Sequence, residues 1–568
     1  MNDSKNLILA VVLSALVLLG WTWAANRFFP ASNPPSTKVE AGKQQPVPQP
    51  EVQPSAPSSP KALQSLSAAL ASSPRVSIRT PMLTGSINLK GAQIDDLLLL
   101  NHRETISKSS PPIRLLSPLG APGAYIAQFG WAAEGAQVPT LDTLWTADGQ
   151  ALTPEHPVTL STQMPSGVRY QIRIGVDDGY LFTIQRSISN GSNEPITVRP
   201  IGLISRSSQS VDRSTWQNHV GPIGVFDGKA NYSVNWKDLD QGTRQAFDGV
   251  SGWLGFTDKY WLTALVPQGE MNGEFRRSPS GGYQADFALP GVSVAPGQAL
   301  STTTRLFAGA KEKSWLDRYE NAGILKLSKS IDWGWFEFFM RPIFDLLMFL
   351  FHTLGNFGLA IICLTLIVRA IMFPIAHKQF QSMAAMRKGQ PKLKAIQERF
   401  KDDKQRQQQE ILKLYQAEKI NPAAGCLPIL LQIPVFYALY KVLLVSVEMR
   451  HQPFVGWIKD LSAADPLTPV NLFGLLHFTP PAMLAVGVLP ILVGATQYLS
   501  MKLNPQPMDP AQAQVFALMP WVLVFVMAPF AAGLQLYWIT NNVLTMAQQW
   551  FLYRKYGLHF SDTHPVHT

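Results

Sequence analysis

Cysteine and charge are both scarce in this sequence. The 568 residues include two cysteines, Cys363 and Cys426, and both lie in apolar segments. This excludes a disulfide framework and a CxxC metal or redox site, so any soluble domain is held by its own core. Charged residues make up 15% of the chain and hydrophobic residues 46%. Such a balance is typical of a membrane protein that carries a large soluble part.

Motifs of catalysis and cofactor binding are missing from the first half of the chain. It contains no HExxH, no GxSxG and no glycine-rich phosphate loop, and its histidines (His102, His156 and His219) are scattered. We therefore predict no catalytic or metal-binding residues in this half of the chain. A membrane-tethered carbohydrate-active enzyme stays open as an alternative, because sheet sandwiches can host such sites.

The first long apolar run covers residues 7–25. A basic residue before it and small residues after it fit a cleaved signal peptide. Its length, with Trp21 and Trp23, fits an uncleaved membrane anchor. We predict an N-terminal transmembrane anchor over residues 1–29, followed by a disordered proline-rich linker over residues 30–74.

Residues 75–316 have a sequence pattern that is typical of a β-domain. In residues 168–176 every second residue is apolar, which is the period of a half-buried strand. Residues 181–188 and 196–204 look like its neighbours in a sheet, joined by short turns. Helical periodicity is weak throughout this region. We predict a large antiparallel β-sandwich outside the membrane.

Residues 317–350 connect the sandwich to the membrane. The first part looks helical and mixed in charge, whereas residues 331–347 are crowded with aromatic side chains. Acidic groups and Pro342 lie among these aromatics and argue against a membrane span. An amphipathic helix lying in the interface fits better. The alternative is an aromatic N-terminal extension of the next span.

Five further apolar segments follow, and with residues 7–25 they predict six transmembrane helices. Their approximate limits are 352–373, 425–447, 481–501, 515–530 and 533–551. We expect Pro374 to end the first of them. Five spans then form a core over residues 351–558, followed by a short tail, residues 559–568. The distribution of basic residues places both termini in the cytoplasm and the sandwich on the opposite side.

The segment between the first two core spans, residues 376–420, is polar and basic. It contains 11 Lys or Arg residues against 5 Asp or Glu. Two helical pieces, with Asp402 or Asp403 as the N-cap of the second, predict a cytoplasmic helical hairpin. A solvated hairpin that only orients the protein fits this composition. A docking surface for a ribosome, a targeting factor or anionic lipid fits it equally.

Arg369 lies inside the first core span, about five residues from its cytoplasmic end. An arginine in hydrocarbon costs from about 3 to above 10 kcal/mol. It could snorkel to the headgroups, pair with neighbouring helices, or act as a functional charge in a wet cavity. Polar residues within the spans favour the cavity: Thr365, Gln432, Gln535, Asn541 and Asn542. The spans contain no Asp or Glu, which weakens the second alternative, a small-solute transporter.

These segments together resemble the YidC family of membrane protein insertases, in the form found in bacteria with two membranes. The matching stretches run in order from Asp332 to His559 and include LTLIVRAIMFP from Leu364, SMAAMRKGQPKLKAIQERF from Ser382, DDKQRQQQEILKLYQAEKINPAAGCLPILLQIPVFYALY from Asp402, WIKDLSAADP from Trp457, LPILVGATQYL from Leu489, MPWVLVFVMAPFAAGLQLYWITNN from Met519 and RKYGLH from Arg554. The front half fits by architecture: anchor, linker and periplasmic β-supersandwich. Two features depart from the family: an apparent insertion at residues 466–480 and a short basic tail.

The resemblance implies a protein of the bacterial inner membrane that inserts and helps fold membrane proteins, alone or beside the Sec translocon. It also implies a hydrophilic groove open to cytoplasm and lipid. A protein of this kind is not an enzyme, has no catalytic or metal-binding residues, and uses no nucleotide and no cofactor. The implied partners are nascent membrane proteins, the Sec translocon with its accessory subunits, the ribosome, the signal recognition particle receptor and membrane lipids. The short tail puts its own ribosome contact in doubt.

The resemblance also assigns roles to residues. Arg369 takes the place of the family's groove arginine. The family's substrate-contacting positions correspond to Thr365, Ile433, Pro434, Phe436, Tyr537 and Trp538. Gln432, Gln535 and Asn541 complete the candidate groove as polar residues of the spans. The hairpin corresponds to the family's recruitment element, and its candidate residues are Lys392, Lys394, Arg399, Asp402 and Asp403.

Overall fold

The structure is a computed structural model. It describes residues 63–555, except 134, 213, 215–217, 279–280, 335, 402, 418–426, 474, 477–484 and 504–509. The chain divides into two units, Met1–Val52 and Gln53–Thr568, and the described residues belong to the second. The expected anchor, most of the expected linker and the tail lie outside the described residues.

Strands fill the region from Arg75 to Ala310. They are β1 (Arg75–Arg79), β2 (Leu83–Asn88), β3 (Gln93–Arg103), β4 (Pro112–Leu116), β5 (Tyr125–Ala133), β6 (Thr146–Ala147), β7 (Ala151–Leu152), β8 (Val158–Gln163), β9 (Arg169–Val176), β10 (Leu181–Ser189), β11 (Ile196–Arg206), β12 (Gly221–Phe226), β13 (Lys229–Asn231), β14 (Gln245–Thr257), β15 (Trp261–Pro267), β16 (Glu270–Arg277), β17 (Tyr283–Ala288), β18 (Val292–Val294) and β19 (Ala299–Ala310). Two short helices, α2 (Leu66–Ala71) and α3 (Trp236–Asp240), accompany them.

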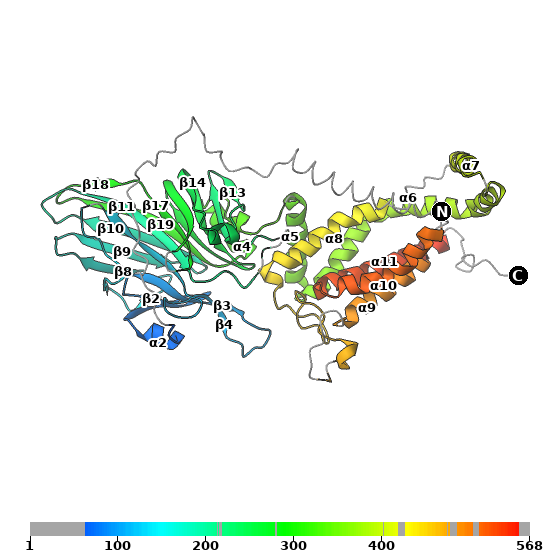
Figure 1. The fold of residues 1–568 in the computed structure, drawn as a ribbon. Helices are drawn as coiled ribbons and strands as arrows, with labels where there is room; N and C mark the ends of the chain where they lie inside the picture. Colours follow the sequence, from blue (N-terminus) through cyan, green and yellow to red (C-terminus); the bar gives the residue numbers. More distant parts are fainter. Residues whose placement is uncertain are drawn as a thin grey trace, which may run out of the picture. The chain divides into compact units, whose positions relative to one another are not determined.

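Strand pairing arranges this region as two sheets (Figure 1). One runs β7-β1-β2-β3-β5-β11-β17-β16-β14, with β4 beside β3 and β18 beside β11. The other runs β6-β8-β9-β10-β19-β15-β14-β12-β13. The long strand β14 belongs to both, because its first half pairs with β16 and its second half with β12 and β15. The buried apolar faces form the core of the predicted β-sandwich.

The alternation in residues 168–176 is confirmed in β9. Tyr170, Ile172, Ile174 and Val176 are buried, and β9 pairs with β10 as expected. The prediction that the next strand lies beside β10 is wrong, because β11 pairs with β5, β17 and β18 in the other sheet. The short connection predicts a turn but does not determine which sheet the chain enters. That choice is made by long-range burial.

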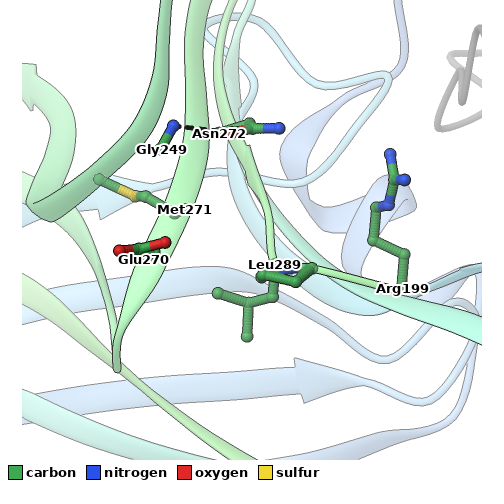
Figure 2. Close-up of a pocket in the computed structure, with 7 residues that line it drawn as sticks. Arg199, Gly249, Glu270, Met271, Asn272 and Leu289 are labelled. Carbon is green, nitrogen blue, oxygen red and sulfur yellow. Dashed lines mark hydrogen bonds between the residues drawn. The ribbon is translucent and has the colours of Figure 1, made fainter. Parts of the chain in front are cut away.

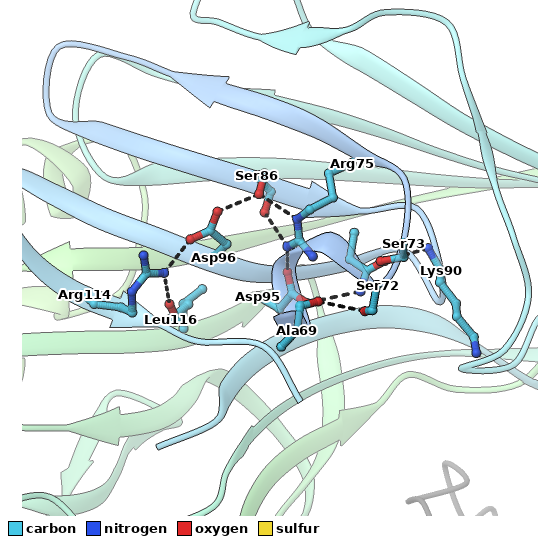
Figure 3. A network of polar contacts seen from close by, with 11 residues as sticks. Ala69, Ser72, Ser73, Arg75, Ser86, Lys90, Asp95, Asp96, Arg114 and Leu116 are labelled. Atoms are coloured by element: carbon cyan, nitrogen blue, oxygen red, sulfur yellow. Dashed lines mark hydrogen bonds and ion pairs between the residues drawn. The ribbon is translucent and has the colours of Figure 1, made fainter. Parts of the chain in front are cut away.

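A chain of polar contacts joins β1, β2, β3 and β4 (Figure 3). A β-bulge in β3 places Asp95 outside the regular pairing of Ser86 with Asp96. Asp95 pairs with Arg75 and Asp96 with Arg114, while Ser86 donates to Asp96 at 2.6 Å. Burial raises the pKa of the Asp95 carboxyl, against the opposing effect of Arg75. Because arginines compensate both carboxylates, the two adjacent aspartates are structural.

Helices dominate after Ala310. They are α4 (Lys313–Asn321), η1 (Leu327–Ser330), α5 (Glu337–Leu354), α6 (Phe357–Arg399), α7 (Lys404–Ala417), α8 (Leu427–Val445), η3 (Val447–Met449), η4 (Pro469–Asn471), α9 (Val488–Lys502), α10 (Pro510–Met527) and α11 (Ala532–Lys555). Among the described residues, one helical segment, Phe357–Lys378, is long and apolar enough to cross a membrane by the usual criteria. Shorter apolar helices cover Gln432–Val445 and Ala517–Met527.

Helix α6 differs from its expected limits at both ends. His352 belongs to α5, which ends at Gly355 with a φ of 69°, and Asn356 caps α6 by accepting from the Leu359 amide at 3.1 Å. At the other end, the expectation that the helix stops at Pro374 is wrong, because α6 continues to Arg399 (Figure 1). A proline removes one helical hydrogen bond, and the 25 helical residues that follow Pro374 outweigh that loss here.

Candidate functional site

Helix α11 carries two polar ridges. Tyr537, Asn541 and Thr545 recur every fourth residue and therefore lie on one face. Trp538 and Asn542 form the neighbouring ridge. The first ridge contacts α6 and α8, and the second contacts α9.

Arg369 on α6 is bonded to the first ridge of α11. Its Nε donates to Asn541 Oδ1 at 2.8 Å, and its Nη2 donates to the Asn541 carbonyl oxygen at 3.2 Å and to the Thr545 hydroxyl. Thr545 Oγ1 donates in turn to the Asn541 carbonyl at 2.6 Å. The guanidinium is therefore fixed in direction by one amide, one carbonyl and one hydroxyl.

The partners of Arg369 are neutral. In the part of the chain that the structure describes, no carboxylate pairs with it. Hydrogen bonds from a charged group to neutral acceptors each contribute about 1.5–3 kcal/mol, but they leave the charge itself without a counter-ion. The side chain is only half-buried. Its charge is therefore available to a further, negatively charged group.

A second contact links α8 to the same ridge. Gln432 Nε2 donates to the hydroxyl of Tyr537, which is buried. We call Arg369, Gln432, Tyr537, Asn541 and Thr545 the polar seam. Thr365 is buried one turn from Arg369 and donates to the Ile361 carbonyl of its own helix at 2.7 Å, so its hydroxyl is already satisfied.

Apolar candidates lie beside the seam on α8. Ile433 is 56% exposed and Pro434 is exposed as well. The Phe436 ring meets the Trp538 ring edge-on, with centroids 5.0 Å apart. Trp538 Nε1 donates to Gln497 of α9 at 3.2 Å. Phe436 and Trp538 thus join α8, α11 and α9, while Ile433 and Pro434 present open apolar surface.

Gln535 lies apart from the other candidates. It is fully buried and donates from Nε2 to the carbonyls of Met527 and Phe530, at 2.9 and 2.8 Å. These bonds close the tight turn between α10 and α11. Its position in the sequence suggested the seam, but its contacts hold the turn.

The hairpin candidates are described only in part. Asp403 accepts from the Arg406 amide at 3.0 Å and so caps α7, as one of the two expected caps. Lys392 and Arg399 are exposed. Asp402 and the side chain of Lys394 lie outside the described residues.

Thr545 is the seam residue that sequence reasoning missed. It lies near the middle of α11, and a single threonine there is unremarkable by composition. Its spacing of four from Asn541 is the signal that could have identified it.

The sandwich contains a pocket of about 150 Å³, and Figure 2 shows its lining. Arg199, Gly249, Glu270, Met271, Asn272, Leu289 and Pro290 line it. Asn272 is engaged with the Gly249 amide at 2.9 Å. Glu270 is the one carboxylate among these lining residues, whereas glycosidases use a pair. This pocket does not support a carbohydrate-active site.

Comparisons with known proteins agree with this architecture. A family model described as "60Kd inner membrane protein" matches residues 349–558, and a model of the "YidC periplasmic domain" matches residues 75–346. The membrane protein insertase YidC of Zymomonas mobilis is 45% identical over 562 residues, covering 98% of this chain and 96% of that protein. The chain belongs to the YidC family.

Further relatives extend over the same length. The membrane protein insertase YidC of Beijerinckia indica is 43% identical, covering 98% of this chain and 97% of that protein. A crystal structure of an active YidC insertase with its first transmembrane domain resolved aligns with 84% of this chain and 95% of its own, at 19% identity and a TM-score of 0.36. The two family models meet between Leu346 and Phe349, inside α5. YidC insertases are not enzymes, and the chain has the family's periplasmic β-sandwich, its helical core and its inner-membrane location.

Proposed function

We propose that the protein is a membrane protein insertase that inserts and helps fold nascent membrane proteins through a hydrophilic groove open to cytoplasm and lipid. It acts alone or with the Sec translocon and its accessory subunits. Family membership supports the activity. Arg369, a guanidinium with neutral partners on α11, is the observation that carries the mechanism.

The neutral partners make the site exchangeable. A carboxylate can bind a guanidinium through two parallel hydrogen bonds and adds an attraction between opposite charges, which an amide or a hydroxyl lacks. At 4 Å and an effective dielectric constant of 20, the attraction adds about 4 kcal/mol. An acidic side chain of an entering segment therefore displaces Asn541 and Thr545 from Arg369. Once the segment passes, Asn541 and Thr545 bind the guanidinium again.

The apolar part of the entering segment takes a different path. Ile433 and Pro434 present exposed apolar surface on α8, close to Gln432 of the polar seam. An apolar segment slides past this surface and the side of α11 into lipid. Its transfer releases about 25 cal/mol per Å² of buried apolar area, so the step needs no nucleotide.

The proposed topology has six spans: residues 7–25, α6, α8, α9, α10 and α11. Helix α6 has 43 residues and a length of about 65 Å, twice the thickness of the hydrocarbon core. Its second half must therefore lie outside the bilayer, and its basic composition places it in the cytoplasm. With α7 it forms the hairpin, which recruits the ribosome and the signal recognition particle receptor. Both termini are then cytoplasmic and the sandwich periplasmic.

Site-specific crosslinking to a stalled nascent membrane protein tests this proposal. Thr365 and Tyr537 are poor probe sites because both are buried. A photo-reactive residue at Ile433 should crosslink to the nascent chain, whereas one at Trp521 on α10, which is also exposed, should not. Equal crosslinking from both positions, or none from Ile433, would show that the substrate does not pass beside the seam.

A further inference from the structure

The loop between α8 and α9 is anchored by one carboxylate. Asp465, which is 6% exposed, accepts from Trp457 Nε1 at 3.1 Å and from the Leu467 amide at 3.0 Å. Its second oxygen accepts from the Leu489 amide at 2.7 Å, in the first turn of α9, where a negative charge is favourable. The base of the loop is therefore fixed to the start of α9.

Beyond this anchor the described residues 468–473, 475 and 476 form a hydrogen-bonded tip. The Phe473 amide donates to the Thr468 carbonyl at 2.9 Å, and the Leu476 amide donates to the Asn471 carbonyl at 3.1 Å. Leu472 and Phe473 have φ values of 50° and 59°. The left-handed region costs a bulky L-residue roughly 1–2 kcal/mol. Two successive residues in this region need a compensating contact.

The large exposed side chains of the described tip residues are all apolar, whereas the polar Thr468 is buried and Asn471 is half-buried. The exposed apolar side chains are Val470, Leu472, Phe473, Leu475 and Leu476, with Leu475 76% exposed. No Asp, Glu, Lys or Arg occurs between Asp465 and Lys502 in the sequence. Contiguous exposed apolar groups of this kind mark a binding surface. The tip also lies within residues 466–480, the segment that departs from the family pattern as apparent extra sequence. The proposed mechanism of membrane protein insertion does not use this segment.

We propose that this tip inserts into the periplasmic leaflet of the membrane, with lipid acyl chains as its ligand. The inference rests on the proposed topology, in which α8 and α9 span the bilayer. The anchor then holds the base of the tip at the membrane boundary, at the start of α9, where Ile491 and Leu492 are also exposed. Trp457 at the base, partly exposed and with its indole N–H bonded, suits the headgroup level. A protein partner would favour a polar or charged rim, whereas the exposed large side chains of the described tip residues are apolar.

Spin-label accessibility tests this inference on the full chain in phosphatidylethanolamine–phosphatidylglycerol liposomes. Leu475→Cys is labelled in a background that carries Cys363→Ala and Cys426→Ala. Val211→Cys in the sandwich, fully exposed, reports water, and Phe525→Cys on α10, exposed and apolar, reports lipid. The Leu475 label should collide several-fold more often with oxygen than with a water-soluble nickel chelate, as the Phe525 label does.

The labels at Val211 and Phe525 distinguish a failure of this inference from a failure of the proposed topology. If the Leu475 label behaves like Val211 while Phe525 reports lipid, the tip is not in the membrane and the inference is wrong. If Phe525 itself reports water, the proposed topology fails first. Repeating the measurement at a much lower protein-to-lipid ratio excludes a second copy as the ligand. A Leu475 label that becomes water-accessible on dilution would overturn the lipid assignment.

Discussion

Asn541 holds the Arg369 guanidinium through both its side chain and its carbonyl oxygen. This residue therefore determines whether the charge is free to meet a substrate. The contact is strong enough to orient the guanidinium and, being neutral, weak enough to be exchanged. At the scale of single residues, the proposed function depends on Asn541 as a neutral partner that leaves the charge of Arg369 uncompensated.

Asn541→Asp should separate stability from activity. The new carboxylate would lie within hydrogen-bond distance of the Arg369 Nε and form a permanent ion pair. We expect the melting temperature in detergent to stay level or rise, while insertion of substrates with acidic translocated segments falls. Both quantities are measured on the purified protein, the second in proteoliposomes.

Asn542→Asp is the matched control. Asn542 lies on the other ridge of α11 and donates to Thr496 Oγ1 at 3.1 Å, with no arginine recorded beside it among the described residues. A carboxylate there should lower the melting temperature. If Asn541→Asp lowers the melting temperature as much as Asn542→Asp, the Arg369 contact is not the one that we describe.

At the residue scale, the sequence alone predicted most residues of the polar seam. Arg369, Gln432, Tyr537 and Asn541 do meet, because charge and amides within apolar spans are rare enough to be informative. Gln535 has the same composition signal but closes a turn instead. Whether a polar residue faces a neighbouring helix or its own turn depends on packing, which the one-dimensional pattern does not contain.

Helix α9 packs closely against α10 through Gly494. A Cβ atom at this position would lie 2.3 Å from Val524 Cγ2 and 3.1 Å from the Pro520 carbonyl oxygen. Small residues at such crossings let helix backbones approach in membranes. The close approach positions Gln497 and Thr496, which bind the second ridge of α11.

Gly494→Val should therefore destabilise the helical core by about 1–3 kcal/mol, the usual cost of overpacking. A lower melting temperature in detergent would show it. Ala495→Val is the control, because Ala495 is exposed on the same helix, so the added methyl groups have room. Equal effects of the two substitutions would exclude the α9–α10 contact as the cause.

Lys311 provides a pH-dependent element at the end of β19. Its ammonium is buried and donates to Thr257 Oγ1 at 3.0 Å and to the Asp258 carbonyl at 2.8 Å. Burial lowers the pKa of Lys311 from 10.5 to about 8. Between these two values the unfolded state binds more protons than the folded state, so stability increases with pH.

We expect the wild type to gain up to about 3 kcal/mol of unfolding free energy, relative to Lys311→Met, as pH rises from 7 to about 10. Denaturant unfolding of the two proteins across this range measures the difference. Parallel pH profiles would show that the Lys311 pKa is not lowered in the folded protein.

At the scale of elements, the alternation of apolar residues was a reliable signal, whereas the predicted helix boundaries were not. The alternation in β9 identified its buried face, because one residue in two faces the core whatever the topology. The helix does not end at Pro374, because the helical residues on both sides of the proline outweigh its low local helix propensity. The sheet of β11 could not be predicted, since pairing with β5 and β17 joins residues far apart in the chain.

For the whole molecule, the proposed insertion path lies in the helical core and leaves the sandwich out. A deletion that tests this should end at Ala310, so that β19 is removed with the rest of the sandwich. A cut before β19 would leave this strand without its neighbours β10 and β15 and expose two strand edges to aggregation. Removing residues 75–310 should retain substantial insertion in cells depleted of the wild-type protein. Complete loss of insertion by a membrane-integrated deletion protein would place an essential function in the sandwich.

The most direct test of the central claim uses two substrates that differ only in the charge of the translocated segment. Their insertion rates are measured in proteoliposomes with the wild type, Arg369→Lys, Arg369→Ala and Arg369→Glu. We predict that Ala and Glu slow the acidic substrate by at least about tenfold, equivalent to about 1.4 kcal/mol, and that Lys retains part of the rate. The neutral substrate should change much less. Wild-type rates for the acidic substrate with both Arg369→Ala and Arg369→Glu would contradict the role assigned to this charge.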